Sequence, residues 1–331
     1  MMSDIPLKLK ANSVFAPYLI DFVEQKRAIG CKYNSTVEIL NLFDDFCVNE
    51  NISETTLTKD NIYHWEQKRF HENETTQSMR IHCVRNFLQF LRNYDIQVPV
   101  KFHTAPKCSK NFVPYIFSSE EIHRFTRAVD DYFSEMCPSS PIRHLVYPVL
   151  FRIIYGCGLR VNEALKLKTK DVDLKRGTFI IRESKGGNER MIAMSDSLAD
   201  ICRNYSANEA IYTYESEYFL PAPDHGYYDS SQVYAVFRKC LYLAGISHGG
   251  RGKGPRLHDL RHTFAVHVLN KWVADGLDVY VCLPILQTYL GHTNISSTEK
   301  YLRLVPQVYS QMTDQYQNAF DYVFPEVSYE K

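Results

Sequence analysis

The sequence lacks an excess of either charge, a long apolar run and a secretion signal. Lys plus Arg and Asp plus Glu number 38 each, so the net charge alone does not favour a nucleic-acid partner. No stretch approaches the roughly 18 apolar residues that a membrane span needs, and residues 1–15 contain no signal-peptide core. We therefore expect a soluble, cytoplasmic protein with no membrane partner.

Paired cysteines and a nucleotide loop are also missing. The nine cysteines are scattered without a C-x-x-C pair, which argues against disulfides and against a zinc site. The glycine-rich stretch at 247–256 has no G-K-[ST] sequence, so it does not match a nucleotide phosphate loop. The 331 residues are long enough for two domains with separate cores.

Two imidazoles, one guanidinium and one phenol follow one another near the C-terminus, at His258, Arg261, His292 and Tyr301. Each of these groups costs about 1 to 3 kcal/mol if it is buried without a polar partner. A guanidinium can bind two phosphate oxygens at once, and imidazole N–H groups add further donors. Cationic neighbours favour the phenolate form of a tyrosine, which can then attack phosphorus. The set predicts a phosphate site, although each residue taken singly could be structural.

The spacing of these residues fits such a site. His258 and Arg261 lie three positions apart and would share one face of a helix. Gly291 can end the preceding helix, and the Ser/Thr-rich residues that follow can start the next one. This pattern puts His292 at a helix junction and Tyr301 on or just after the next helix.

Three sequence boxes, with a predicted hairpin as the fourth, resemble the tyrosine recombinases, also called the phage integrase family. HDLRHTFA at 258–265 and LGHTNISSTEKY at 290–301 resemble the two C-terminal boxes, and GCGLRVNEAL at 156–165 resembles the first. By this resemblance Arg160 is a second phosphate-binding arginine, and Glu163 is the carboxylate that supports it. The predicted strand–turn–strand at 177–195 places Lys185 where the family has a lysine that protonates the departing 5′ oxygen. Arg190 is a poorer candidate for that role.

The resemblance implies a site-specific recombinase that cleaves and rejoins double-stranded DNA. Tyr301 would form a 3′-phosphotyrosyl link, and neither a metal nor another cofactor would be required. The family acts as a homotetramer on synapsed DNA, with a monomer or dimer when free, and accessory DNA-bending or directionality factors are possible. A longer 205–256 region and an extended tail favour a mobile element and its integration, excision or transposition. A chromosome-dimer resolvase, a type IB topoisomerase-like enzyme and a non-cutting DNA-binding protein stay as alternatives.

The expected fold is mainly α with a small antiparallel β-sheet. The sequence predicts an N-terminal bundle of four helices. Helical periodicity is present at 15–30, in the stretch that follows a predicted Ser35–Glu38 capping box, at 57–70 and at 75–94. The resemblance makes this bundle a SAM-like, DNA-binding domain and the later part a mixed α/β catalytic domain, which a Ser118–Glu121 capping box would open. The predicted parts are residues 1–96, the linker 97–116, the catalytic domain 117–305 and the tail 306–331.

Several basic residues outside the four boxes are candidates for DNA contact, with a merely solvated charge as the alternative for each. Helix 308–320 in the tail has one apolar face, which would dock onto a neighbouring protomer or onto its own domain. The candidate DNA-binding residues are Lys32, Arg80, Arg85, Lys101, Lys107, Lys110, Arg251, Lys253 and Arg256.

Overall fold

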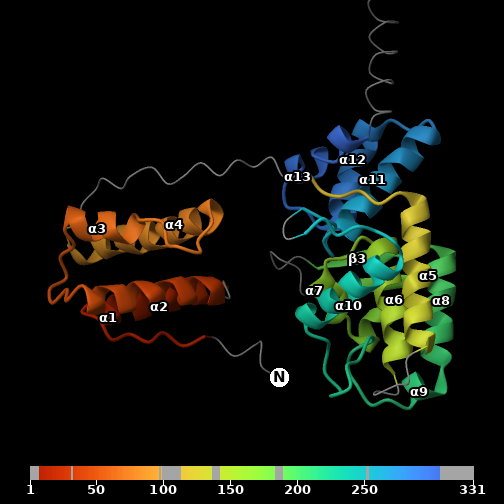
Figure 1. The fold of residues 1–331 in the computed structure, drawn as a ribbon, viewed down its shortest axis with the longest axis horizontal. Helices are drawn as coiled ribbons and strands as arrows, with labels where there is room; N and C mark the ends of the chain where they lie inside the picture. The colour runs from red at the N-terminus through yellow and green to blue at the C-terminus, as the bar shows by residue number, and fades with distance from the viewer. Residues whose placement is uncertain are drawn as a thin grey trace, which may run out of the picture. The chain divides into compact units, whose positions relative to one another are not determined.

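The computed structural model describes residues 7–30, 33–96, 98, 113–135, 142–182, 189–250 and 253–305. The chain divides into two compact units, residues 1–112 and residues 113–331, and each has its own core (Figure 1). Within the described residues, no helix is both long enough and apolar enough to span a membrane.

The first unit is built from helices around an aromatic core. Phe22 and Phe43 both pack against Phe87, with ring centroids 5.6 and 6.0 Å apart, and Phe43 meets Trp65 edge to face at 5.2 Å. Aromatic burial of this kind supplies most of the stabilisation of a small helical core. The elements are α1 (Ala16–Ala28), α2 (Asn34–Asn49), α3 (Lys59–Glu66), α4 (Glu74–Phe90) and the 3₁₀ turn η1 (Leu91–Tyr94).

Two local predictions for this unit are wrong. The capping box predicted for Ser35 and Glu38 does not start α2, because the helix already begins at Asn34, after Tyr33 in the left-handed region at φ 55°. The helix predicted at 57–70 is shorter, because Gln67 turns to extended backbone with ψ 139°. Local periodicity did not capture the contacts that end this helix.

Arg80 supplies those contacts, which corrects its assignment as a candidate for DNA binding. Its guanidinium lies in the interior, ion-paired with Glu72 at 2.7 Å, and stacks on the Trp65 ring at 4.8 Å. It also donates to the carbonyl oxygen of Trp65 and, at 2.9 Å, to that of Gln67. A guanidinium used in this way satisfies the C-terminal carbonyl groups of α3 and is not available to a phosphate.

The second unit is a helical domain with a small sheet. Figure 1 shows α5, α6 and α8 side by side, and their apolar faces and that of α10 share one core. The predicted Ser118–Glu121 capping box is confirmed by reciprocal backbone-to-side-chain hydrogen bonds of 2.9 and 3.1 Å. The helices that surround this core are α5 (Ser119–Glu135), α6 (Arg143–Gly156), α7 (Val161–Leu165), α8 (Asp196–Ala207), α9 (Glu209–Tyr212) and α10 (Ser230–Leu243).

The small sheet is antiparallel, as the sequence predicted, and its strand order is β1–β2–β3. A 3₁₀ turn, η2 (Thr169–Asp171), leads into β1 (Val172–Asp173), and β2 (Thr178–Ile181) pairs with β3 (Arg190–Ala193). Phe179 and Ile192 face each other in the register, and both are buried. The turn between β2 and β3, with Lys185, lies outside the described residues.

The last helices form a second packed block of this unit. Helices α11 (Asp259–Ala274) and α12 (Val279–Leu290) lie together at its upper end in Figure 1. Gly291, at φ 67°, ends α12 as predicted, because a residue without Cβ adopts this conformation at low cost. The chain continues through α13 (Ser296–Glu299) into η3 (Leu302–Leu304), and Tyr301 is buried between them. The predicted helix in the tail lies outside the described residues.

Candidate active site

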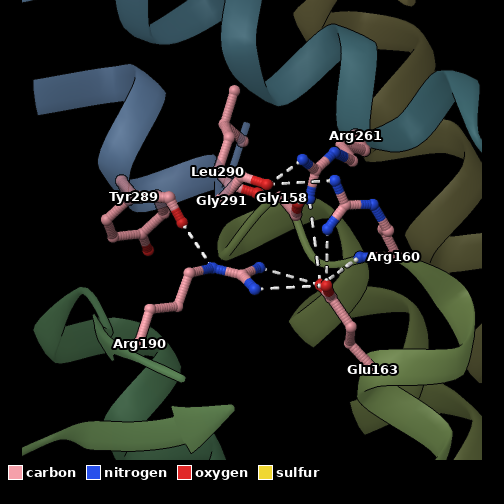
Figure 2. Close-up of polar contacts among 8 residues, drawn as sticks. All are labelled: Gly158, Arg160, Glu163, Arg190, Arg261, Tyr289, Leu290 and Gly291. Carbon is pink, nitrogen blue, oxygen red and sulfur yellow. Dashed lines mark hydrogen bonds and ion pairs between the residues drawn. The ribbon is translucent and has the colours of Figure 1, made fainter. Parts of the chain in front are cut away.

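Three guanidinium groups from three separate segments surround the carboxylate of Glu163 (Figure 2). Arg160 Nη1 lies 2.7 Å from Oε1, and Arg190 Nη2 lies 2.8 Å from Oε2. Arg261 Nη1 is 3.9 Å from Oε2. Glu163 therefore holds three cations close together that would otherwise repel one another.

Arg160 is placed by the start of α7. It is the N-cap residue of this helix, its backbone N–H donates to Glu163 Oε2 at 3.0 Å, and its Nη2 donates to the Gly291 carbonyl at 3.2 Å. Its side chain is 24% exposed, whereas that of Glu163 is 3% exposed. The Arg160 side chain is thus held by Glu163 and by the Gly291 carbonyl, and part of it stays exposed to solvent.

Arg261 is almost completely buried on α11, with 1% exposure. It donates to the carbonyl oxygens of Gly158 at 2.8 Å and Leu290 at 2.6 Å, so it joins the end of α6 to the end of α12. Burial, together with the charge of Arg160, lowers the pKa of Arg261 to about 10. The side chain therefore keeps its positive charge at neutral pH.

Arg190 belongs to this cluster, which the sequence interpretation underrated. Its Nε donates to the Tyr289 carbonyl at 2.9 Å, and its guanidinium makes a bidentate contact with Glu163. The available signal was the period of β3, because alternation puts Arg190 on the same face as buried Ile192. A buried-face arginine on a short strand indicates a buried acidic partner.

The pKa of Glu163 reflects this arrangement. Burial by itself would raise the pKa of the carboxyl group, but hydrogen bonds and charge from Arg190 and Arg160 outweigh burial. The pKa is therefore below its usual value, and Glu163 is ionised at neutral pH. It can act as a fixed anion that orients the arginines.

Three histidines lie near these arginines, and the two that are half-buried, His262 and His292, stay neutral at pH 7. Burial, assisted by neighbouring positive groups that include Arg261, lowers the pKa of His262 and His292 to about 4, whereas His258 is exposed. His258 is the N-cap residue of α11, and its ring lies 4.7 Å from that of His262. A neutral imidazole offers one donor and one acceptor, so these residues can donate to an oxyanion without adding charge.

Tyr301 is 4% exposed and contacts two of these histidines. Its hydroxyl lies 2.9 Å from His262 Nδ1, and its ring stacks near His292 with centroids 6.1 Å apart. His292 Nδ1 is 2.9 Å from the buried Thr298 hydroxyl, which fixes the ring. Burial raises the pKa of Tyr301, and the charges of Arg261 and Arg160 oppose this shift.

The structure brings together Arg160, Glu163, His258, Arg261, His292 and Tyr301 in one place. Sequence reasoning missed His262 as the tyrosine's partner, since a histidine beside an arginine on a helix gives no local signal for that contact. Arg256 lies next to the site and is held through Asp259 Oδ1 at 3.1 Å, while Lys253 is exposed and Arg85 is half-buried on α4. Lys32, Lys101, Lys107, Lys110, Lys185 and Arg251 lie outside the described residues.

The arrangement can bind and polarise an oxyanion such as a phosphodiester. Guanidinium groups, imidazole N–H groups and the N-terminus of α11 each favour negative charge near them. In the part of the chain that is described, no group of three or more His, Cys, Asp or Glu residues has the arrangement of a metal site.

Comparisons with known proteins agree with this chemistry. The family model described as the phage integrase family matches residues 117–307. A putative integrase/recombinase, y4rB, of Sinorhizobium fredii is 28% identical over 302 residues, which cover 89% of this chain and 95% of that protein. Tyrosine recombinase XerC of Halalkalibacterium halodurans is 30% identical over 232 residues, which cover 69% of this chain and 70% of that protein.

The fold is also similar to a solved structure. The crystal structure of a lambda integrase tetramer bound to a Holliday junction matches with a TM-score of 0.55 and 15% sequence identity. The match covers 86% of this chain and 79% of that chain.

Proposed function

The chain belongs to the phage integrase family of tyrosine recombinases, enzymes that cleave and rejoin DNA, and we propose that Tyr301 is its nucleophile. The observation that carries this proposal is the position of the Tyr301 hydroxyl, beside His262 and within the electrostatic reach of Arg160 and Arg261. The phenol oxygen would attack a DNA phosphorus, form a 3′-phosphotyrosyl bond and release the 5′ oxygen.

The arginines and histidines would stabilise the transition state of this attack. Negative charge builds on the non-bridging oxygens, where Arg160 and Arg261 offer planar donors held in place by Glu163. His258 and His292 would donate through imidazole N–H groups. These donors are fixed before DNA arrives, which is the condition under which such groups contribute most.

Lys185 is proposed as the general acid that protonates the departing 5′ oxygen. The support is its place in the sequence between β2 and β3, because Arg190, the first residue of β3, contacts Glu163. In the reverse step a 5′ hydroxyl from a partner strand would attack the phosphotyrosyl bond and release Tyr301. The energy of the broken phosphodiester is kept in the protein–DNA bond, so this cycle uses no nucleotide cofactor.

The biological role is proposed to be recombination of a mobile element, with integration, excision or transposition as its outcome. The name of the y4rB relative, putative integrase/recombinase, favours this role over dimer resolution. The lambda integrase tetramer on a Holliday junction supports double-stranded DNA as the partner and a homotetramer as the working assembly. The tail 306–331 would join protomers, and accessory factors would bend DNA or set direction. The enzyme would act in the cytoplasm.

DNA contact outside the catalytic cluster is proposed for basic residues around it. Exposed Lys253 and ion-paired Arg256 precede α11 and can reach a phosphate beside the scissile one. The lysines of the 97–116 segment and half-buried Arg85 would add contacts that position the duplex without reading its sequence. Such contacts make binding strongly dependent on salt.

Trapping of the covalent intermediate tests the proposal. The full chain is incubated with a pool of nicked suicide duplexes of random sequence, and adducts that survive denaturation are isolated and sequenced. The wild type should give an adduct on one sequence family, while Tyr301→Phe should give none and bind the recovered duplex within a few-fold of wild type. Tyr280→Phe, which changes an exposed tyrosine on α12, is the matched control.

The outcomes also separate the rival functions. An adduct that persists in Tyr301→Phe excludes Tyr301 as the nucleophile. Relaxation of a supercoiled plasmid without strand exchange between two recovered sites would indicate a topoisomerase-like enzyme. Specific binding without any adduct in the wild type would indicate a DNA-binding protein that no longer cuts.

A further inference from the structure

We propose that His262 is a catalytic residue, which holds the Tyr301 hydroxyl through Nδ1 and accepts its proton as the phenol oxygen attacks phosphorus. This inference rests on the proposed function, because it assigns the base for the same nucleophile. His262 lies within the 258–265 box, one residue after Arg261 on α11, but the family resemblance assigned it no role.

The contact is direct and enclosed. His262 Nδ1 and the Tyr301 hydroxyl oxygen are 2.9 Å apart, a distance at which an O–H group donates to an imidazole nitrogen. Tyr301 is 4% exposed, so water is largely excluded from the hydroxyl. His262 is therefore the base already in place for this proton.

The other histidines are committed elsewhere. His292 Nδ1 contacts the Thr298 hydroxyl at 2.9 Å, and the His292 ring stacks beside that of Tyr301. His258 contacts the edge or face of the His262 ring, with ring centroids 4.7 Å apart at an angle of 87°. His292 thus lies beside the phenol ring and His258 beside the His262 ring, whereas His262 meets the phenol oxygen.

The charged groups around His262 keep Nδ1 available as an acceptor. From its own helix and the residues before it, Arg256, Arg261 and His258 face the ring, and His292 and Tyr301 face it from the segment after α12. Burial and then the positive charges lower the pKa of His262 to about 4, so the ring is neutral when DNA is absent. A bound phosphate adds negative charge beside the ring and favours proton uptake.

The proton and electrons then balance in each direction. As the Tyr301 O–P bond forms, the phenolic proton moves to His262 Nδ1, and the P–O5′ bond breaks as the general acid of the proposed function gives a proton to the 5′ oxygen. When a 5′ hydroxyl attacks the phosphotyrosyl bond, its proton returns to that general acid, and the protonated His262 returns its proton to the Tyr301 oxygen. Since one residue serves both steps, the same variant should impair cleavage and rejoining alike.

Single-turnover cleavage of the suicide duplex recovered by adduct trapping tests this role. His262→Asn keeps a short acceptor near the hydroxyl but cannot take its proton, and His262→Ala removes both functions. We expect both variants to bind the duplex within a few-fold of wild type and to cleave about 100-fold more slowly at pH 7. Added imidazole should accelerate His262→Ala and leave Tyr301→Phe inactive.

The pH profile separates a base from a purely structural contact. The wild-type rate should level off once His262 is neutral in the complex, whereas the rate of His262→Asn should keep rising towards pH 9. The reason is that without a base the reaction depends on the small phenolate fraction of a tyrosine whose ordinary pKa is 10.0. The control is His123→Asn, which changes an exposed imidazole on α5.

Two results would overturn the proposal. One is a wild-type cleavage rate in either His262 variant. The other is a His262→Asn variant that cleaves slowly but whose cleavage rate depends on pH as that of wild type does. His262 would then have only a structural role. Both leave the proposed function intact, because that depends on an adduct in the wild type and its loss in Tyr301→Phe.

Discussion

Arg190 contacts both oxygens of the Glu163 carboxylate, from Nη1 to Oε1 at 3.1 Å and from Nη2 to Oε2 at 2.8 Å. The same guanidinium donates through Nε to the Tyr289 carbonyl at 2.9 Å. It therefore connects β3, α7 and the end of α12 (Figure 2). Because Arg160 and Arg261 meet the same carboxylate and the same end of α12, one buried anion sets the positions of both proposed phosphate ligands.

Arg190→Ala should impair cleavage more than DNA binding. The variant leaves Glu163 short of its bidentate partner, and loss of one member of a buried ion pair costs about 3 to 5 kcal/mol. A small displacement of Arg160 can slow the chemical step by about 100-fold, because catalysis depends on alignment. Single-turnover adduct formation and urea unfolding measure the two effects.

Arg190→Lys and Arg203→Ala are the matched variants for that experiment. Lysine keeps the charge but cannot contact two carboxylate oxygens and the Tyr289 carbonyl together, so its rate should lie between those of wild type and alanine. Arg203 makes an exposed ion pair on α8, and its loss should change the free energy of unfolding by less than about 1 kcal/mol. Wild-type cleavage by a folded Arg190→Ala would show that the carboxylate is held without Arg190.

Gly158→Ala should disturb Arg261 through the Gly158 carbonyl group, to which Arg261 donates. Gly158 has φ +57°, and a Cβ built there would overlap the ring of Phe264, while its carbonyl oxygen receives Arg261 Nη1. We expect a loss of unfolding free energy of more than about 2 kcal/mol, from the backbone conformation and the overlap together. Cleavage should also slow, because the Arg261 guanidinium moves with the carbonyl.

Gly177→Ala isolates the backbone cost. Gly177 has φ +65°, but a Cβ there meets only the Ala199 methyl group at 3.6 Å, an ordinary contact. This variant should lose about 1 to 2 kcal/mol of unfolding free energy and cleave at the wild-type rate. Equal effects of the two substitutions on cleavage would contradict the link between Gly158 and Arg261.

The sequence could predict much of the fold and the types of groups in the site, for physical reasons. Gly291 was predictable as a helix end because the left-handed conformation is a local property. The phosphate chemistry was predictable because few kinds of site use two arginines, two histidines and a tyrosine in this sequence order. The His262–Tyr301 contact was not, because it depends on how η3 packs against α11, which is set by tertiary contacts between distant segments.

Arg80 shows the same limit in the first unit. It was predicted to contact DNA or to be a solvated charge on a helix face, but the side chain turns inward to Glu72 and to the end of α3. A buried ion pair of this kind is decided by the partner that folding brings near. The period of α4 puts Arg80 on the same face as buried Val84 and Phe87, but it does not identify Glu72 as the partner.

Arg80→Ala should therefore destabilise the first unit instead of only weakening DNA binding. Glu72 would be left buried without its partner, and the carbonyl groups at the end of α3 would lose their donor, at a cost of about 3 to 5 kcal/mol. The chain has two tryptophans, Trp65 and Trp272, so a Trp272→Phe background leaves Trp65 as the reporter for this unit. Urea unfolding followed by Trp65 emission measures the effect, with exposed Arg92→Ala as control.

Two half-buried site histidines should make the second unit less stable in mild acid. The pKa values of His262 and His292 fall from 6.5 to about 4 on folding, so between these pH values the unfolded chain binds more protons than the folded chain. Stability is then fully present above pH 6.5 and is lost as the pH falls towards 4, by on the order of a few kcal/mol. Urea unfolding by far-UV circular dichroism at pH 7.5, 6 and 5 measures this slope in the absence of DNA. His262→Asn should flatten it, whereas His123→Asn should not, and a slope unchanged by His262→Asn would contradict the assignment.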